Sequence, residues 1–147
     1  MIDRQLLPLA LLYANDGHEI QGRTRMQKLV FLIQEEFDDT SALPGEYNYI
    51  PYDYGPFAKK LYADLDYLKD RGYIKESTET IKDGKVQYNY RLTPEGREHL
   101  KHQPDNKVNQ ILDLAEPIKQ DFNRVSLPDL LDYVYTKYPE YAENSVL

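Results

Sequence analysis

The chain has 147 residues, of which 41% are hydrophobic and 29% are charged, proportions typical of a single globular domain. No apolar run approaches the ~20 residues that a membrane-spanning helix needs, and the start lacks the pattern of a signal peptide, so we expect a cytoplasmic protein without membrane contact. The absence of cysteine excludes disulfides and thiolate nucleophiles, and a net charge of −7 argues against indiscriminate binding to nucleic acid.

Two helices are predicted in the first 37 residues. The first spans residues 3–15, is amphipathic, and ends at a turn-forming Asn-Asp-Gly sequence; its apolar face comprises Leu6, Leu7, Ala10 and Leu11. The second spans residues 22–37, where apolar residues recur at helical spacing. Its polar side chains lie elsewhere on the helical wheel and are Arg23, Arg25, Lys28 and Gln34. We therefore expect a core-facing helix with a basic first half.

A loop with a short strand is predicted over residues 38–55, which are rich in Tyr and Pro. Four tyrosines are expected to alternate along this strand and to share one face, which covers the core or recognises a partner: Tyr47, Tyr49, Tyr52 and Tyr54. A third helix is then expected to start with Pro56 at its first position and to end with Gly72 as its C-cap residue.

A β-hairpin is predicted over residues 73–92, because Asp83-Gly84 lies midway between two β-prone runs. A two-residue turn there pairs Ile81 with Val86, and both turn residues should have positive φ. Thr93-Pro94 next supplies the N-cap and the first position of a fourth helix. The fold class predicted is mainly α with a small antiparallel hairpin, a winged helix-turn-helix-like domain followed by C-terminal helices.

The C-terminal third is predicted to be a helical extension. Residues 102–107 are polar and contain a proline, which places a linker between a winged-helix-like domain, residues 1–101, and the extension, residues 102–147. One helix follows with an apolar stripe bent at Pro117, and another starts at Ser126. We expect a homodimer through residues 108–138; its contacts would include Leu130, Leu131 and Val134. The alternative is that both stripes fold back on the first helix of the same chain.

Two stretches resemble a known family. Residues 22–31 read GRTRMQKLVF and residues 52–57 read YDYGPF, and both resemble blocks of the SocA-like antitoxin domain, also called Panacea, and of the related YwgA-like proteins. The ending YVYTKYPEY, residues 133–141, is also similar. The resemblance implies a protein that neutralises a toxin, adapts it to a partner, or regulates transcription. The hairpin and the sequence YRLTPEGR, residues 90–97, resemble winged-helix transcription regulators instead and depart from a minimal antitoxin domain.

Basic residues of the second helix, the third helix and the hairpin are candidate DNA contacts. Cations at a helix and at a hairpin tip are suited to contact phosphates and fix the register of a winged helix on a duplex. Two observations favour the alternative of an ordinary solvated face: aspartates 64, 66 and 70 interleave with the lysines, and residues 38–55 replace the ~3–4 residue turn of a helix-turn-helix. The candidates are Arg23, Arg25, Lys28, Lys59, Lys60, Lys82, Lys85 and Arg91.

No enzymatic motif, cofactor or metal site is predicted. The sequence lacks Gly-x-Ser-x-Gly, a phosphate-binding glycine loop and His-Glu-x-x-His. A zinc site would need more ligands than His99 and His102; Glu95 and Glu98 are near, but histidines at a helix end more often face solvent or bond to its last carbonyls. We therefore predict a non-catalytic regulator that binds double-stranded DNA, in a toxin–antitoxin or defence operon. The alternative is a protein-binding antitoxin or adaptor module, with a partner such as a toxin, that does not contact DNA.

Overall fold

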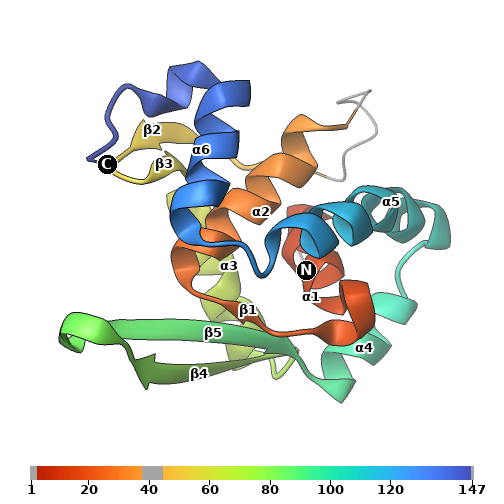
Figure 1. Cartoon of the computed structure of the whole chain (residues 1–147). Coiled ribbons are helices and arrows are strands. Elements are labelled where there is room, and N and C mark those ends of the chain that lie inside the picture. The colour runs from red at the N-terminus through yellow and green to blue at the C-terminus, as the bar shows by residue number, and fades with distance from the viewer. Residues whose placement is uncertain (1–2, 38–44, 147) are drawn as a thin grey trace.

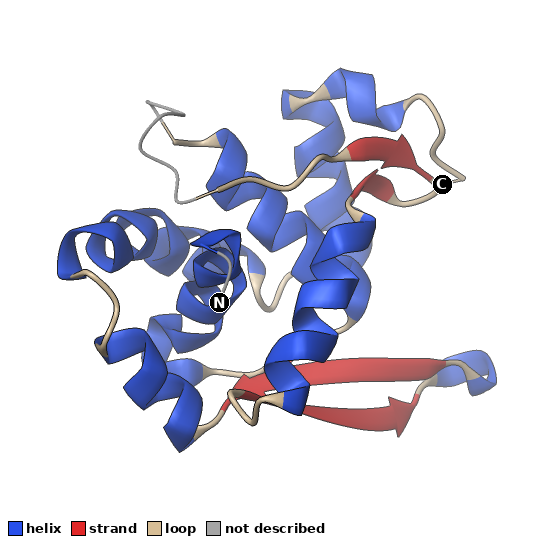
Figure 2. Ribbon diagram, turned by 180° about the vertical axis from the view of Figure 1, so that it is seen from behind, coloured by secondary structure: helices blue, strands red, loops and turns tan. Residues whose placement is uncertain are grey.

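The computed structural model describes residues 3–37 and 45–146, and this part of the chain is mostly helical (Figures 1 and 2). The helices are α1 (Leu6–Gly17), α2 (Arg23–Glu35), α3 (Lys59–Asp70), α4 (Pro94–Lys101), α5 (Asp105–Phe122) and α6 (Leu127–Lys137). The strands are β1 (Ile20–Gln21), β2 (Ile50–Tyr52), β3 (Gly55–Phe57), β4 (Ile74–Thr80) and β5 (Val86–Leu92). They form an antiparallel sheet in the order β1-β5-β4 and a separate β2–β3 ribbon. A mainly helical fold with a small antiparallel hairpin is therefore confirmed.

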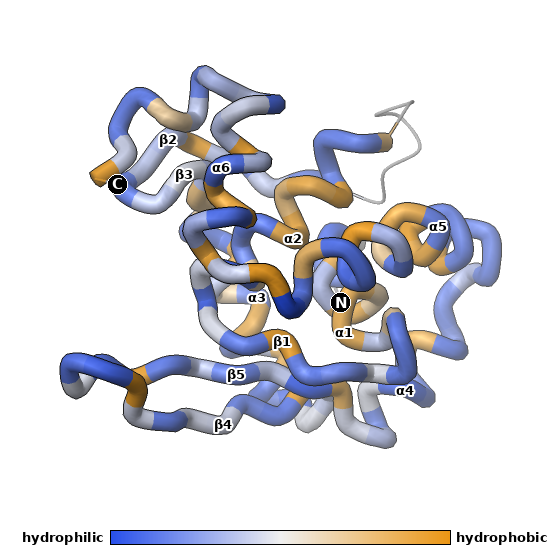
Figure 3. Tube along the Cα trace, in the orientation of Figure 1, coloured by the Kyte–Doolittle hydropathy of each residue, from blue (hydrophilic) through white to orange (hydrophobic). Residues whose placement is uncertain are grey.

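Helix α1 was predicted to be amphipathic, but its leucines are buried on all sides of the helix. Leu9 and Leu12, outside the expected apolar face, are as inaccessible to solvent as Leu7 and Leu11. Helices α2, α4 and α5 and strand β5 all contact α1, so no side of this helix is left for water. Figure 3 shows the resulting concentration of hydrophobic residues in α1 and α2. The helical geometry ends at residues 14–16, close to the predicted turn.

Helix α3 begins at Lys59, three residues later than predicted. Pro56 lies instead in β3, paired with Pro51. The side-chain amide of Gln27 accepts a hydrogen bond from the Ala58 backbone N–H at 3.1 Å and donates one to the Ala58 carbonyl at 2.9 Å, which holds the preceding segment extended. A proline φ near −65° suits extended backbone as well as a helix start, so the Gly-Pro signal was ambiguous. Gly72, at φ +81°, follows the helix end as expected.

The tyrosines of residues 47–54 do not share one face, contrary to the prediction. Tyr47 is buried and Tyr49 half-buried, whereas Tyr52 and Tyr54 are exposed. Tyr52 lies three positions after Tyr49, and this odd spacing breaks the two-residue period of a strand. The first pair therefore covers the core and the second pair faces solvent. Residues 38–44 of the predicted loop lie outside the described part of the chain.

The β4–β5 hairpin projects from the helical body (Figure 1). Its register is Thr80 with Val86, one residue from the predicted pairing, because the loop has three residues, Lys82–Gly84, rather than two. The positive φ values of Asp83 (70°) and Gly84 (72°) are as predicted. At its base the Thr93 hydroxyl accepts a hydrogen bond from the Gly96 N–H at 2.9 Å, which confirms the predicted N-cap of α4.

Helices α5 and α6 complete the core of the same chain. Helix α5 starts at Asp105, so the separation from α4 is shorter than the predicted linker, and it lies against α1. Helix α6 begins after its predicted Ser126 N-cap and lies against α2. Three residues expected at a dimer interface are covered within the chain, which corrects their assignment as contacts: Leu130, Leu131 and Val134. Dimerisation itself stays a prediction. In the described residues no helix is long and apolar enough to cross a membrane.

Candidate nucleic-acid interface

Helix α3 and the hairpin form one continuous, exposed part of the molecule. Helix α3 packs against β4, and Figure 2 shows it standing beside the hairpin, which extends away from its lower end. We call the exposed side chains of residues 59–92 the α3–hairpin surface. Five of the eight predicted DNA contacts lie exposed on it: Lys59, Lys60, Lys82, Lys85 and Arg91.

These five residues occupy distinct places on that surface. Lys59 and Lys60 form the first turn of α3, and Lys82 and Lys85 flank the turn at the hairpin tip. Arg91 lies near the base of β5, where its guanidinium is 3.8 Å from the Glu19 carboxylate. The structure thus brings cations to a helix start and to a hairpin tip, the two places where the sequence predicted them.

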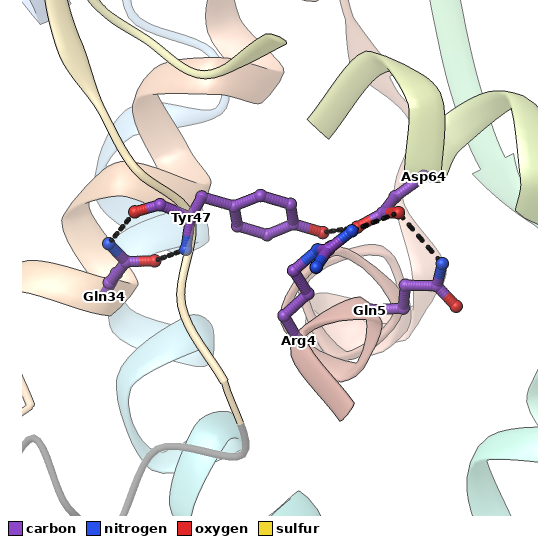
Figure 4. Close-up of polar contacts among 5 residues, drawn as sticks. All are labelled: Arg4, Gln5, Gln34, Tyr47 and Asp64. Carbon is purple, nitrogen blue, oxygen red and sulfur yellow. Dashed lines mark hydrogen bonds and ion pairs between the residues drawn. The ribbon is translucent and has the colours of Figure 1, made fainter. Parts of the chain in front are cut away.

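Asp64 is buried and does not lie on this surface, although the sequence interleaves it with the lysines of α3. Its carboxylate accepts hydrogen bonds from Arg4 Nε at 2.8 Å, Gln5 Nε2 at 3.0 Å and the Tyr47 hydroxyl at 2.6 Å (Figure 4). Burial is the main reason that the pKa of Tyr47 is raised, which keeps its hydroxyl a donor. Because residues 61, 64, 65 and 68 share the apolar stripe of α3, helical spacing alone could have placed Asp64 inside.

Charge is distributed unevenly between the α3–hairpin surface and the rest of the chain. Residues 59–92 contain eight Lys or Arg and six Asp or Glu, and one of those six, Asp64, is buried. The remaining residues contain ten Lys or Arg and nineteen Asp or Glu. Residues 59–92 therefore carry an excess of positive charge in an otherwise acidic chain. Asp66 and Asp70 remain exposed on it, towards the end of α3.

Arg25 and Lys28 are buried, which corrects their prediction as DNA contacts. Their exposed fractions are 9% and 2%, because α5, α6 and β3 cover the side of α2 that the helical wheel marked as polar. Arg25 donates to the carbonyl of Phe122, the last residue of α5, at 2.7 Å, and Lys28 donates to the carbonyl of Pro56 at 2.9 Å. Burial lowers the pKa of Lys28 to about 7. Neither side chain can reach a phosphate.

Arg23 links α2 to the hairpin. Its guanidinium carbon lies 3.9 Å from the centroid of the Tyr88 ring, and its Nε donates to the Tyr90 hydroxyl at 3.0 Å. It is also 3.7 Å from the Glu76 carboxylate. A stacked and hydrogen-bonded guanidinium is fixed in place. Its main role in the structure is therefore to hold the hairpin against α2, and only a part of it faces solvent.

An apolar groove that the sequence did not predict lies between the hairpin and α6. Its volume is about 470 Å³, and it contains exposed Ile81 and Val86 from the hairpin. Its walls come from segments far apart in the sequence, which is why no local pattern revealed it. The other lining residues are Gly22, Arg23, Thr24, Tyr54, Lys85, Gln87, Tyr88, Leu127, Pro128 and Leu131.

The described residues include no group of three His, Asp or Glu side chains arranged to hold a metal ion. His99, considered above as a metal ligand, stacks on the Tyr73 ring with centroids 4.2 Å apart. The sequence matches no protein-family model and no curated protein, so the geometry of these surfaces carries the functional argument.

Proposed function

We propose that this chain is a winged-helix protein that binds double-stranded DNA through its α3–hairpin surface and regulates transcription. The winged-helix interpretation is supported by the order α1, β1, α2, α3, β4, β5, into which the β2–β3 ribbon is inserted between α2 and α3, and by the antiparallel pairing of β1 with β5. The third helix and the hairpin are the elements that such a domain presents to DNA. The resemblance of residues 90–97 to winged-helix regulators supports the same interpretation.

The observation that carries the proposal is the segregation of charge. A duplex carries one negative charge per ~1.7 Å of its axis, and cations near it release bound counterions. The α3–hairpin surface offers exposed lysines while the rest of the chain is acidic, so the protein would approach DNA with this face first. Burial of Asp64 removes one carboxylate that would oppose such contact.

The start of α3 is the part of the helix best suited to phosphate. No side chain caps this helix, so its first backbone N–H groups and its dipole add to the charges of Lys59 and Lys60. Asp66 and Asp70 disfavour deep entry of the other end into a groove. We therefore expect the first turn of α3 and the hairpin tip to make the main contacts with the DNA backbone.

Titration of a fluorescein-labelled duplex from the region upstream of the chain's own gene tests the proposal by fluorescence anisotropy. Lys85→Glu at the hairpin tip should weaken binding at least tenfold at ~50 mM salt, because it replaces an attraction by a repulsion. Lys101→Glu, an equal charge change on α4 outside the α3–hairpin surface, is the control. No binding at that salt, or an equal loss in the control, would contradict the proposal.

A second candidate function is a protein-binding module of the antitoxin or adaptor type. The specific observation in its favour is the apolar groove, because contact with a phosphate backbone does not require exposed Ile81 and Val86. The resemblance of residues 22–31 and 52–57 to SocA-like antitoxin domains supports it as well. The two functions share Lys85, but only the protein-binding function needs the exposed apolar side chains of Ile81 and Val86, so variants at these two residues test it separately.

A further inference from the structure

The apolar groove borders a strand edge that is only partly used. Strand β5 pairs with β4 from Val86 to Leu92, but β1 pairs only with Asn89 and Tyr90. The chain leaves the sheet at Gly22, whose N–H still donates to the Tyr88 carbonyl at 2.9 Å and whose φ of 96° turns it into α2. Beyond that point the described residues supply no third strand beside β5.

The alternation of a strand identifies which backbone groups this leaves open. The N–H and C=O of one residue point to the same side, and those of the next residue point to the opposite side. Because the Tyr88 carbonyl faces β1, the Tyr88 N–H and both backbone groups of Val86 face the same way, towards the groove. The Lys85 carbonyl, which accepts from the Ile81 N–H at 2.9 Å, faces β4 instead, as this alternation requires.

The lining of the groove defines the chemistry of an occupant. Apolar side chains of the hairpin and α6 predominate, and among the lining residues the charged side chains are Arg23 and Lys85, both basic. The N-terminus of α2, at residues 22–24, also lines the groove and has no side-chain cap, and its first turn contains no acidic residue. A carboxylate placed there would meet unpaired N–H groups and the positive end of the helix dipole.

We propose that this groove binds an extended, acidic segment of a partner protein, which adds a strand to the free edge of β5 next to Val86 and Tyr88. Alternate apolar side chains of that segment enter the groove, and its carboxylates face Arg23, Lys85 and the start of α2. Strand addition of this kind takes its affinity from backbone hydrogen bonds and its specificity from side-chain pockets. The inference rests on the second candidate function.

Four labelled nine-residue peptides test the proposal by fluorescence anisotropy with the full chain. They alternate glutamate with valine, isoleucine, leucine or phenylalanine, and matched peptides carry lysine in place of glutamate. We expect at least one acidic peptide to bind, its lysine counterpart to bind at least tenfold more weakly, and N-methylation of alternate peptide N–H groups to cause a similar loss. Hydrogen exchange of the Val86 and Tyr88 amides should slow when the peptide is bound.

Val86→Asp is the variant that probes the groove, because this side chain is 52% exposed and the fold does not depend on its burial. This substitution should weaken binding of the acidic peptide at least tenfold. Ile50→Asp is the matched control: Ile50 is 53% exposed and lies outside the groove, so the same substitution there should leave peptide binding unchanged.

Several outcomes would overturn the proposal. These are failure of all four acidic peptides to bind, equal binding of the N-methylated peptides, and equal loss in Val86→Asp and Ile50→Asp. A dimer of the chain that Val86→Asp abolishes would assign the groove to a second copy. A purified partner protein that binds wild type and Val86→Asp equally well would keep the second candidate function and reject the groove as its site.

Discussion

The basic side chains of α2 and those of the hairpin tip have opposite environments. Lys28 on α2 is enclosed by β3 and α6, and its ammonium serves one backbone carbonyl, whereas Lys85 at the hairpin tip is exposed. Both residues are lysines and both were predicted as DNA contacts, but Lys28 lies within a helical pattern and Lys85 follows a predicted turn. The difference shows that here packing of distant elements decides whether a cation is enclosed in the fold or exposed to solvent.

The buried cations of the core share one function in the structure. Lys119 donates to the carbonyls of Leu12, at 3.2 Å, and Ala14, at 2.7 Å, near the point where the helical geometry of α1 ends. Arg25 does the same at the end of α5, and Lys28 at β3. Such carbonyls lack a partner in their own element, and a cation near a helix C-terminus also favours the dipole. Lys119 and Arg25 therefore stabilise helix ends that are covered by other parts of the chain, and Lys28 stabilises the middle residue of β3.

The largest effect in this comparison is expected from Asp64→Asn, on the buried face of α3. The substitution removes the charge that pairs with Arg4 and weakens the hydrogen bonds from Arg4, Gln5 and Tyr47, so the free energy of unfolding should fall by about 3 kcal/mol. Asp66→Asn, on the exposed face of the same helix, should change it by less than ~0.5 kcal/mol. Urea unfolding at neutral pH measures both changes. Equal losses of unfolding free energy in the two variants would contradict the difference in burial between the two faces of α3.

Lys28→Met should change how stability depends on pH. Between pH 7 and its ordinary pKa, Lys28 binds more protons in the unfolded than in the folded chain, so rising pH stabilises the wild type. The variant lacks this contribution, and from pH 7 to pH 9 the wild type should gain about 2 kcal/mol relative to it. Denaturant unfolding at both pH values tests this, with Lys85→Met as the control for losing one lysine. If the unfolding free energies of the wild type and Lys28→Met changed equally from pH 7 to pH 9, the result would contradict the burial of this ammonium.

A smaller effect distinguishes the base of the hairpin from its tip. Thr93→Ala removes the N-cap bond to the Gly96 N–H and the hydroxyl bond to the Gly72 carbonyl, at 2.6 Å, and should cost about 1 kcal/mol. Thr80→Ala, near the exposed end of β4, should cost less than ~0.5 kcal/mol. Thermal unfolding that ranks the two variants the other way would show that the exposed end is the better-packed part.

Features with strong local signals could be predicted from the sequence. The Thr93 and Ser126 N-caps and the positive φ of Asp83 and Gly84 depend on neighbouring residues only, and the structure confirms them. The start of α3 could not be predicted, because Pro56 fits two conformations and Gln27, 31 residues before Ala58, selects the extended one. The predicted hairpin register was wrong by one residue, because the Asp-Gly pair lies in a three-residue loop instead of a two-residue turn.

The candidate site was predictable only in part, for a similar reason. The exposed lysines at 59, 60, 82 and 85 lie at a helix start and a turn, where exposure is the usual outcome. The burial of Arg25 and Lys28 depends on α5 and α6, which the helical wheel of α2 does not describe. The apolar groove combines residues 22–24, 81–88 and 127–131, which become neighbours only after folding.

The salt dependence of duplex binding tests the central claim most directly, because it counts the cations that contact phosphate. We predict that the wild type binds duplex DNA at ~50 mM salt. The slope of the logarithm of the binding constant against the logarithm of salt concentration is negative; Lys85→Gln should make it less steep by about one, and Lys28→Met should leave it unchanged. Absence of binding at that salt, or an equal fall in slope for both variants, would contradict the assignment of the α3–hairpin surface to DNA.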